Sequence, residues 1–174
     1  FTGSVPVGRQ LAAQAAALLK KSTLELGGHA PVIVAQDVDV ERVVELAVAA
    51  KFRNAGQLCI CPTRFFVHAS IYDAFVSRFA TRAAALRVGS GFDAAVGMGP
   101  LANARRVEAM RHFCGDALER GAQIVCGGAV PADQGSGFFW APTVIADIPD
   151  DALAMQSEPF GPLALMTPFA DIDE

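Results

Sequence analysis

Short apolar runs alternate with helix-like segments along this chain, and few architectures accommodate that alternation. Residues 31–34 are apolar at every position, which predicts a strand that is buried on both faces. The next segment repeats apolar side chains at helical spacing from Val40 to Val48, so we expect a helix that runs to about Phe52. Strands that alternate with helices predict an α/β fold, a three-layer αβα architecture with a mostly parallel sheet.

The same patterns predict the other elements. Helices are expected over residues 8–21, from residue 70 onward, and over residues 103–121. The side chains expected to face inward are Ile71, Phe75, Phe79 and Leu86 in the second of these helices and Val107, Met110, Ala117 and Leu118 in the third. Further strands or extended segments are expected at residues 23–26, 64–67, 124–126, 138–145 and 163–166.

The composition excludes several classes of protein. Hydrophobic residues make up 52% of the 174 positions and charged residues 18%, which is too apolar for a disordered chain. With 14 basic against 18 acidic side chains, the chain lacks the basic surplus of a nucleic-acid-binding face. No apolar run reaches the roughly 18 residues of a membrane span. We therefore expect neither a nucleic-acid partner nor a membrane.

Four cysteines invite a disulfide or metal interpretation, but Cys59, Cys61, Cys114 and Cys126 fit reduced thiols of a cytoplasmic protein better. His112 lies close to Cys114, yet no second ligand pair accompanies them, so no metal is expected. The chain starts without methionine and stops shortly after an apolar run. We therefore expect it to be an internal piece of a longer protein.

Two residues are candidates for chemistry. Cys59 follows a helix end and a loop with Gly56, where exposure and nearby backbone N–H groups favour the reactive thiolate. Taken alone, such a cysteine is more often a buried structural residue. Glu25 is a lone carboxylate on an apolar strand, and burial there would make it a stronger general base. The alternative for Glu25 is a strand-end glutamate that reaches solvent.

Four segments together resemble the aldehyde dehydrogenase superfamily. They are FTGS with Gly8, LELGG at 24–28, GQLC at 56–59 and EPFGP at 158–162, in this order, and the resemblance covers essentially the whole chain. It implies that residues 1–27 are the end of a cofactor-binding domain. It implies that residues 28–174 are most of an aldehyde-dehydrogenase-like catalytic domain, incomplete at its C-terminal end. The implied reaction oxidises an aldehyde to a carboxylic acid with NAD or NADP.

The resemblance also implies roles for individual residues. Cys59 matches the nucleophile that forms a thiohemiacetal and then a thioester, and Glu25 matches the base that activates water to hydrolyse it. The positions that match cofactor contacts are Gly3, Ser4, Gly8, Leu26, Gly27, Glu158 and Phe160. Gly3 and Ser4 match a turn where the pyrophosphate meets a helix N-terminus. Without the other motifs, Glu158 would be an ordinary loop carboxylate and Phe160 a core aromatic residue.

A narrower similarity concerns the substrate. Residues 51–57 with Cys59, Ile60 and Cys61 are similar to the succinate-semialdehyde dehydrogenase branch. In that branch the arginine matching Arg53 holds the far carboxylate of the substrate, which suits a guanidinium fork. The alternative is that Arg53 stabilises the C-terminal end of a helix. The same similarity implies a redox switch between Cys61 and Cys59, although Cys61 could equally be a small buried filler.

Two other functions stay open. A CoA-acylating relative would pass the thioester to CoA, and Glu25 argues against it because such relatives often lack this base. A non-catalytic domain of the same fold is the other alternative. For the full-length protein the resemblance implies a homodimer or homotetramer acting on a small-molecule aldehyde. It also implies that residues 1–174 alone are inactive.

Overall fold

The computed structural model describes residues 1–133 and 136–173. One sheet dominates it, and its strands lie in the order β3 (Ala30–Val34), β4 (Pro62–His68), β7 (Leu163–Phe169), β6 (Thr143–Ala146), β5 (Gln123–Cys126). The pairs β3–β4, β4–β7 and β7–β6 are parallel, and β5 runs antiparallel to β6. The expected α/β class with a mostly parallel sheet is confirmed.

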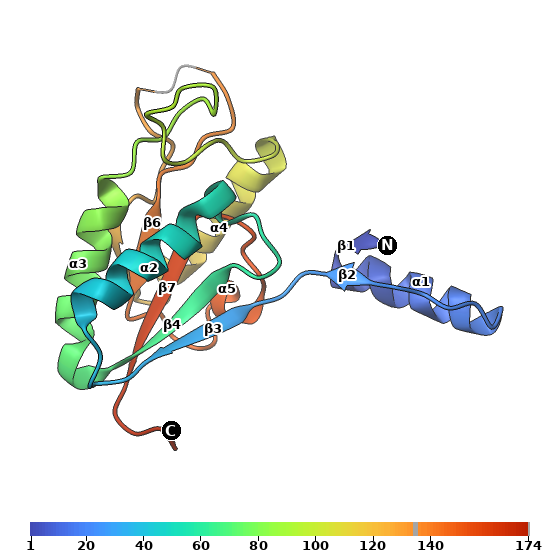
Figure 1. Cartoon of the computed structure of the whole chain (residues 1–174), viewed down its shortest axis with the longest axis horizontal. Coiled ribbons are helices and arrows are strands. Elements are labelled where there is room, and N and C mark those ends of the chain that lie inside the picture. The colour runs from blue at the N-terminus through green and yellow to red at the C-terminus, as the bar shows by residue number, and fades with distance from the viewer. Residues whose placement is uncertain (134–135, 174) are drawn as a thin grey trace.

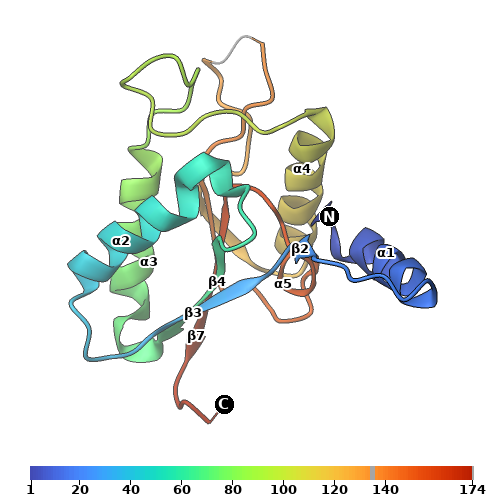
Figure 2. The ribbon, with the colours of Figure 1, turned by 45° about the vertical axis from the view of Figure 1, so that its right-hand side comes forward.

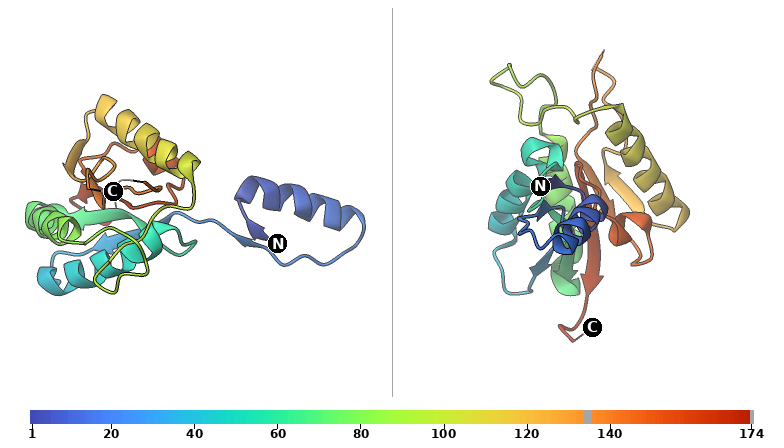
Figure 3. Two further views of the ribbon diagram at one scale, coloured as in Figure 1. Left: turned by 90° about the horizontal axis from the view of Figure 1, so that it is seen from above. Right: turned by 90° about the vertical axis from the view of Figure 1, so that its right-hand side faces the viewer.

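Helices cover both faces of this sheet. α2 (Val40–Phe52) and α3 (Tyr72–Ala84) pack together on one face, whereas α4 (Ala104–Glu119) and the short α5 (Leu153–Gln156) lie on the other (Figures 2 and 3). Aromatic rings pack between the sheet and the layer formed by α2 and α3. Phe65 of β4 contacts Phe79 of α3, with ring centroids 5.3 Å apart. Phe75 joins them, and all three rings are at most 1% exposed. The three-layer architecture therefore follows from the apolar stripes of the sequence.

The N-terminal residues form an arm beside this body. The arm, residues 1–26, consists of β1 (Thr2–Gly3), α1 (Val5–Ala17) and β2 (Glu25–Leu26), and β1 pairs with β2 in parallel. An extended segment joins β2 to β3, so the arm projects away from the sheet (Figure 1). The arm is thinly packed, because α1 has a single buried residue, Gly8, and Leu19 is 96% exposed.

Several expectations about the elements are wrong in detail. β3 is not buried on both faces, because it is an edge strand, no described helix covers its outer face, and Ile33 is 60% exposed. Leu118 points outward from α4 and is 52% exposed. Leu86 packs against the core as expected, but it lies beyond the end of α3. The extended segment 138–145 pairs only from Thr143 onward. α5 was not expected, since four residues are too few for a helical period to register.

Candidate active site

The loop that carries Cys59 begins with an unusual turn. α2 ends at Phe52, and Asn54, Ala55 and Gly56 then adopt φ values of 50°, 53° and 72°. Glycine takes this left-handed conformation freely and asparagine tolerates it, whereas alanine does so at a cost in strain. The turn reverses the chain and presents Cys59 as an exposed thiol, as the sequence predicted.

Gln57 fixes this loop from both sides. Its side-chain amide donates to the carbonyls of Asn54 at 3.1 Å and Pro100 at 3.3 Å. Its side-chain oxygen accepts from the backbone N–H of Ala102 at 2.9 Å. The loop is thereby braced against the segment that leads into α4, which restrains the position of Cys59. Gln57 was quoted within a motif, but its bracing role depends on contacts that only the fold creates.

A cleft of about 590 Å³ lies between the arm and the body. It brings together eight residues that sequence motifs had singled out: Gly3, Ser4, Glu25, Leu26, Gly27, Cys59, Glu158 and Phe160. The other residues that line it are Thr2, Gln57, Leu58 and Arg106. Segments from both ends of the sequence therefore meet around the thiol.

Three of the singled-out residues lie elsewhere. Gly8 is buried in α1, where a Cβ would come within 2.5 Å of the Leu26 side chain, so it allows α1 to pack on β2. Arg53 is exposed at the C-cap of α2 and is not among the residues that line the cleft. Cys61 is buried, 2% exposed, behind the loop.

Glu25 differs from its expected environment. It is exposed rather than buried, because β2 pairs only with the two-residue β1 and no layer of the described residues covers it. The burial expected for Glu25 is therefore not provided by these residues. Glu25 does line the same cleft as Cys59, as a water-activating base must.

Glu158 lies where the body meets the arm. A Cβ on Gly27 would be 2.1 Å from Glu158 Oε2, so a side chain at this position would displace the Glu158 carboxylate. Partial burial raises the pKa of Glu158, while the backbone N–H of Gly28 and the positive charge of Arg106 oppose the rise. The carboxylate therefore lies against the backbone of Gly27 and Gly28, in the field of Arg106.

Arg106 is the residue that sequence reasoning missed. It lies in the first turn of α4, and its Nη2 donates to the carbonyls of Pro159 and Phe160. Its Nε is buried and has no hydrogen-bond partner among the described residues. Burial lowers the pKa of Arg106, and the charge of Glu158 raises it. A positive side chain at a helix N-terminus is electrostatically unfavourable, and that was the available signal.

The arm offers a place for a phosphate. Ser4 is the N-cap of α1 but makes no side-chain capping hydrogen bond, and the first turn contains no acidic residue. Such an uncapped helix N-terminus suits an anion. Because Ser4 and Glu158 line one cleft, the residues present fit a dinucleotide with its pyrophosphate at α1 and a ribose at Glu158.

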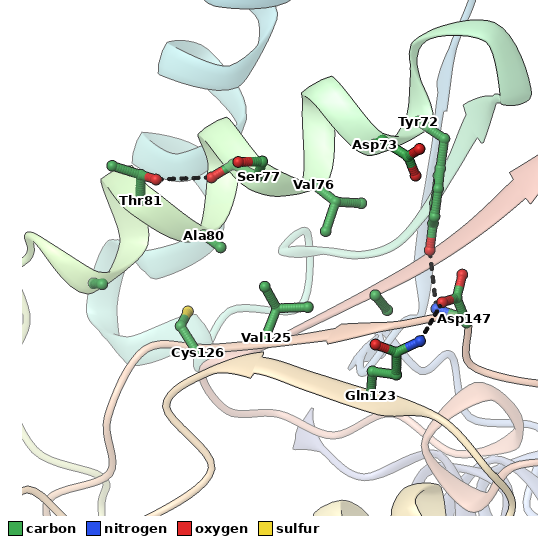
Figure 4. Close-up of a pocket in the computed structure, with 12 residues that line it drawn as sticks. Tyr72, Asp73, Val76, Ser77, Ala80, Thr81, Gln123, Val125, Cys126 and Asp147 are labelled. Carbon is green, nitrogen blue, oxygen red and sulfur yellow. Dashed lines mark hydrogen bonds between the residues drawn. The ribbon is translucent and has the colours of Figure 1, made fainter.

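A second cavity, of about 540 Å³, lies between α3 and β5 (Figure 4). The Tyr72 hydroxyl accepts from the backbone N–H of Asp147 at 2.9 Å and donates to the Met166 carbonyl at 3.1 Å. Burial raises the pKa of Tyr72. No singled-out residue lines this cavity, and Tyr72 serves there to join α3 to β6 and β7.

Residues 1–133 and 136–173 contain neither a metal-binding cluster nor a membrane-spanning helix. No group of three His, Cys, Asp or Glu side chains is placed to hold a metal ion. No helix in these ranges has the length and apolarity that crossing a membrane requires.

Comparison with known proteins gives consistent matches. The family model described as "Aldehyde dehydrogenase family" matches residues 1–174. The chain is 53% identical over 174 residues to 4-(hydroxymethyl)benzenesulfonate dehydrogenase of Comamonas testosteroni, covering 100% of this chain and 36% of that protein. It is 44% identical over 171 residues to the NADP(+) succinate-semialdehyde dehydrogenase of Escherichia coli K12, covering 98% and 35%.

A solved structure agrees in fold. The succinate-semialdehyde dehydrogenase from Burkholderia pseudomallei matches with a TM-score of 0.94 and 44% identity, over 98% of this chain and 35% of that one. The chain therefore spans about 36% of the length of the curated relatives that it matches.

Proposed function

The chain belongs to the aldehyde dehydrogenase family, and we propose that the full-length protein containing it oxidises an aldehyde to a carboxylic acid with NAD or NADP. The observation that supports this most directly is the single cleft shared by Cys59, Glu25, Glu158 and the N-terminus of α1. The proposed nucleophile, the proposed base and the residues that we assign to dinucleotide binding all line it. We assign residues 1–27 to the cofactor-binding domain and residues 28–174 to the catalytic domain.

The mechanism follows from the residue types in the cleft. Cys59 Sγ attacks the aldehyde carbonyl and forms a thiohemiacetal, for which a soft, exposed thiol braced by the Gln57 loop is well suited. Ser4 and Glu158 would hold a dinucleotide in this cleft, and that cofactor would supply the hydride acceptor needed to convert the thiohemiacetal into a thioester on Cys59. Glu25 takes a proton from water, which hydrolyses the thioester and frees the thiol. Backbone N–H groups near Cys59 stabilise the negative oxygen.

The substrate that we propose is an aldehyde with an anionic group at its far end. The names of two relatives each specify a substrate with an anionic group. It is a sulfonate for the Comamonas protein and a carboxylate for the E. coli protein. Arg53 is an exposed guanidinium on the turn that leads to Cys59, and it is the residue assigned to this group.

Substitution of Arg53 tests this assignment. In the full-length protein, Arg53→Ala should reduce kcat/KM for succinate semialdehyde by about 10-fold or more, because a charge-assisted contact is lost. Butyraldehyde oxidation, which lacks the contact, should change little. The preference is measured by absorbance of the reduced cofactor. An unchanged ratio of the two rates in Arg53→Ala would leave Arg53 only its helix-capping role.

Arg106 is proposed to support cofactor binding. Arg106→Gln should weaken binding of the reduced dinucleotide about 10-fold or more, because the guanidinium holds the Pro159 and Phe160 carbonyls and brings a positive charge to the cleft. The positive charge of Arg106 lowers the pKa of Glu158, so its removal should raise that pKa. The Glu158 carboxylate should then become protonated, and dinucleotide binding should be lost, at a higher pH than in the wild type. Cofactor fluorescence titration over pH measures both effects.

The matched control is Arg105→Gln. Arg105 is exposed on the same turn of α4 and does not line the cleft, so its variant should bind the dinucleotide like the wild type. Equal weakening by both substitutions would mean that general positive potential, rather than the placement of Arg106, matters.

Three further proposals concern the whole protein. We propose that it is cytoplasmic and assembles as a homodimer or homotetramer. We expect residues 1–174 alone to lack activity, because Glu25 and the arm are thinly packed. Activity of the isolated chain on succinate semialdehyde would contradict this last expectation.

A further inference from the structure

A fully buried lysine lies directly behind the Cys59 loop. Lys51, in the last turn of α2, is 0% exposed, and Cys61, just before β4, is 2% exposed. Lys51 Nζ lies 3.4 Å from Cys61 Sγ. A Cβ placed on Gly56 would be 3.3 Å from the same nitrogen, so the amine lies immediately beneath the left-handed turn. The mechanism proposed above uses neither Lys51 nor Cys61.

The surroundings of this pair favour an uncharged amine. A lysine ammonium has three donor hydrogens, yet among the described residues Cys61 Sγ is the single acceptor that Lys51 Nζ reaches. Burial lowers the pKa of Lys51, while Cys61 and the charge of Glu158 oppose the decrease. His29 supplies no negative charge, because burial and the charge of Arg64 lower its pKa to about 4. A neutral amine is a nucleophile, whereas an ammonium is not.

The Cys61 thiol makes its contacts on the same side of the loop as Lys51. Besides Lys51 Nζ, the Cys61 Sγ contacts the carbonyls of Lys51 at 3.4 Å and Pro62 at 3.5 Å. Cys59, by contrast, is exposed and lines the cleft. A disulfide across one intervening residue would also be strained. The nucleophile that contacts Cys61 Sγ in this structure is therefore the Lys51 amine, at 3.4 Å.

We propose that Lys51 and Cys61 form an oxidative modification site, in which a hydroperoxide converts the pair into a covalent N–S cross-link. Hydrogen peroxide first transfers one oxygen to Cys61, giving a sulfenic acid and one water, so that sulfur is oxidised by two electrons and the peroxide is reduced. The Lys51 amine then attacks that sulfur. The N–S bond forms, the S–O bond breaks, and the hydroxyl leaves with one amine proton as a second water.

The cross-link would close the catalytic loop at its base. Lys51 and Cys61 are ten residues apart and enclose the left-handed turn, Gln57 and Cys59. A bond between them joins the end of α2 to the start of β4 and removes the amine from beneath Gly56. Thiols reverse it, since they attack the sulfur and release the amine. The site lies outside the reaction path, so its detection does not depend on the proposed enzymatic function.

Peptide mapping of the full-length protein tests the proposal. After treatment with hydrogen peroxide, non-reducing digestion should yield a peptide that joins Lys51 to Cys61 with the loss of two hydrogen atoms and no added oxygen. Trypsin should no longer cleave after Lys51, and dithiothreitol should restore both the peptides and the cleavage. The exposed Lys20 and Lys21 should remain unmodified.

Two variants separate the cross-link from a Cys59–Cys61 disulfide. Cys59→Ser should retain the joined peptide, and Lys51→Met, which keeps the length of the side chain but removes the amine, should abolish it. The wild-type map decides the matter even if Lys51→Met does not fold. Cys61 recovered in a disulfide with Cys59, or as a free sulfinic acid beside an unmodified Lys51, would overturn the proposal.

Discussion

Replacement of Cys59 by serine in the full-length protein should reduce aldehyde oxidation by about 10⁴-fold or more, the scale of loss when a covalent nucleophile is removed. The reason is chemical, because a serine hydroxyl is a far poorer nucleophile than a thiolate. Dinucleotide binding should be retained, since Ser4, Glu158 and Arg106 are untouched. The measurement is single-turnover formation of reduced cofactor with succinate semialdehyde.

Cys114 provides the matched control. It is 4% exposed in α4, and burial raises its pKa to about 12, so Cys114→Ser should leave the rate of oxidation nearly unchanged. Alkylation should follow the same order, with Cys59 labelled rapidly and Cys114 protected. Full activity of Cys59→Ser would exclude covalent catalysis by this thiol, and loss in both variants would indicate general destabilisation.

Glu25 distinguishes hydrolysis from transfer to CoA. Glu25→Gln should permit one rapid turnover of reduced cofactor and then stall, because the thioester on Cys59 is no longer hydrolysed. If added CoA restores turnover, the acylating alternative gains weight. The variant also tests whether Glu25 can act as the base although no described residue covers it on β2.

The sequence was sufficient for the layers of the fold. α2 and α3 have apolar stripes of ordinary helical spacing, and β4, β6 and β7 are apolar runs that a parallel sheet buries, so local pattern and tertiary packing agree. Local pattern and tertiary packing disagree at β3. An apolar run does not indicate whether its strand lies at the edge of the sheet with one face uncovered. Ile33 is exposed for that reason.

The residues of the candidate site likewise differ in whether the sequence alone could reveal them. Cys59, Glu25 and Glu158 were found because their motifs are local, and the fold gathers them into one cleft. Arg106 and the Lys51–Cys61 pair escaped because their significance comes from contacts across the fold, with Arg106 reaching Phe160 across 54 residues. A lysine in a helix is normally solvent-exposed, so nothing in the sequence of α2 indicates that Lys51 is enclosed.

Gly56→Ala should be the most disruptive single change in the catalytic loop. The added Cβ would lie 2.2 Å from the carbonyl oxygen of Gly161 and 3.3 Å from Lys51 Nζ, at a backbone φ of 72° that alanine adopts only with strain. Relief requires the loop to move away from the Gly161 segment. We expect the free energy of unfolding to fall by about 2–4 kcal/mol and aldehyde oxidation to be lost, since Cys59 and Glu158 lie on the two separated segments.

Gly115→Ala is the control with the opposite sign. Gly115 lies inside α4, and a Cβ there meets nothing within 4 Å, so the helix should gain up to about 1 kcal/mol and activity should persist. Thermal unfolding and the oxidation rate of both variants are compared with the wild type. A Gly56→Ala protein as stable and active as Gly115→Ala would mean that the turn tolerates a side chain. The close packing of the two loops would then not be what positions the thiol.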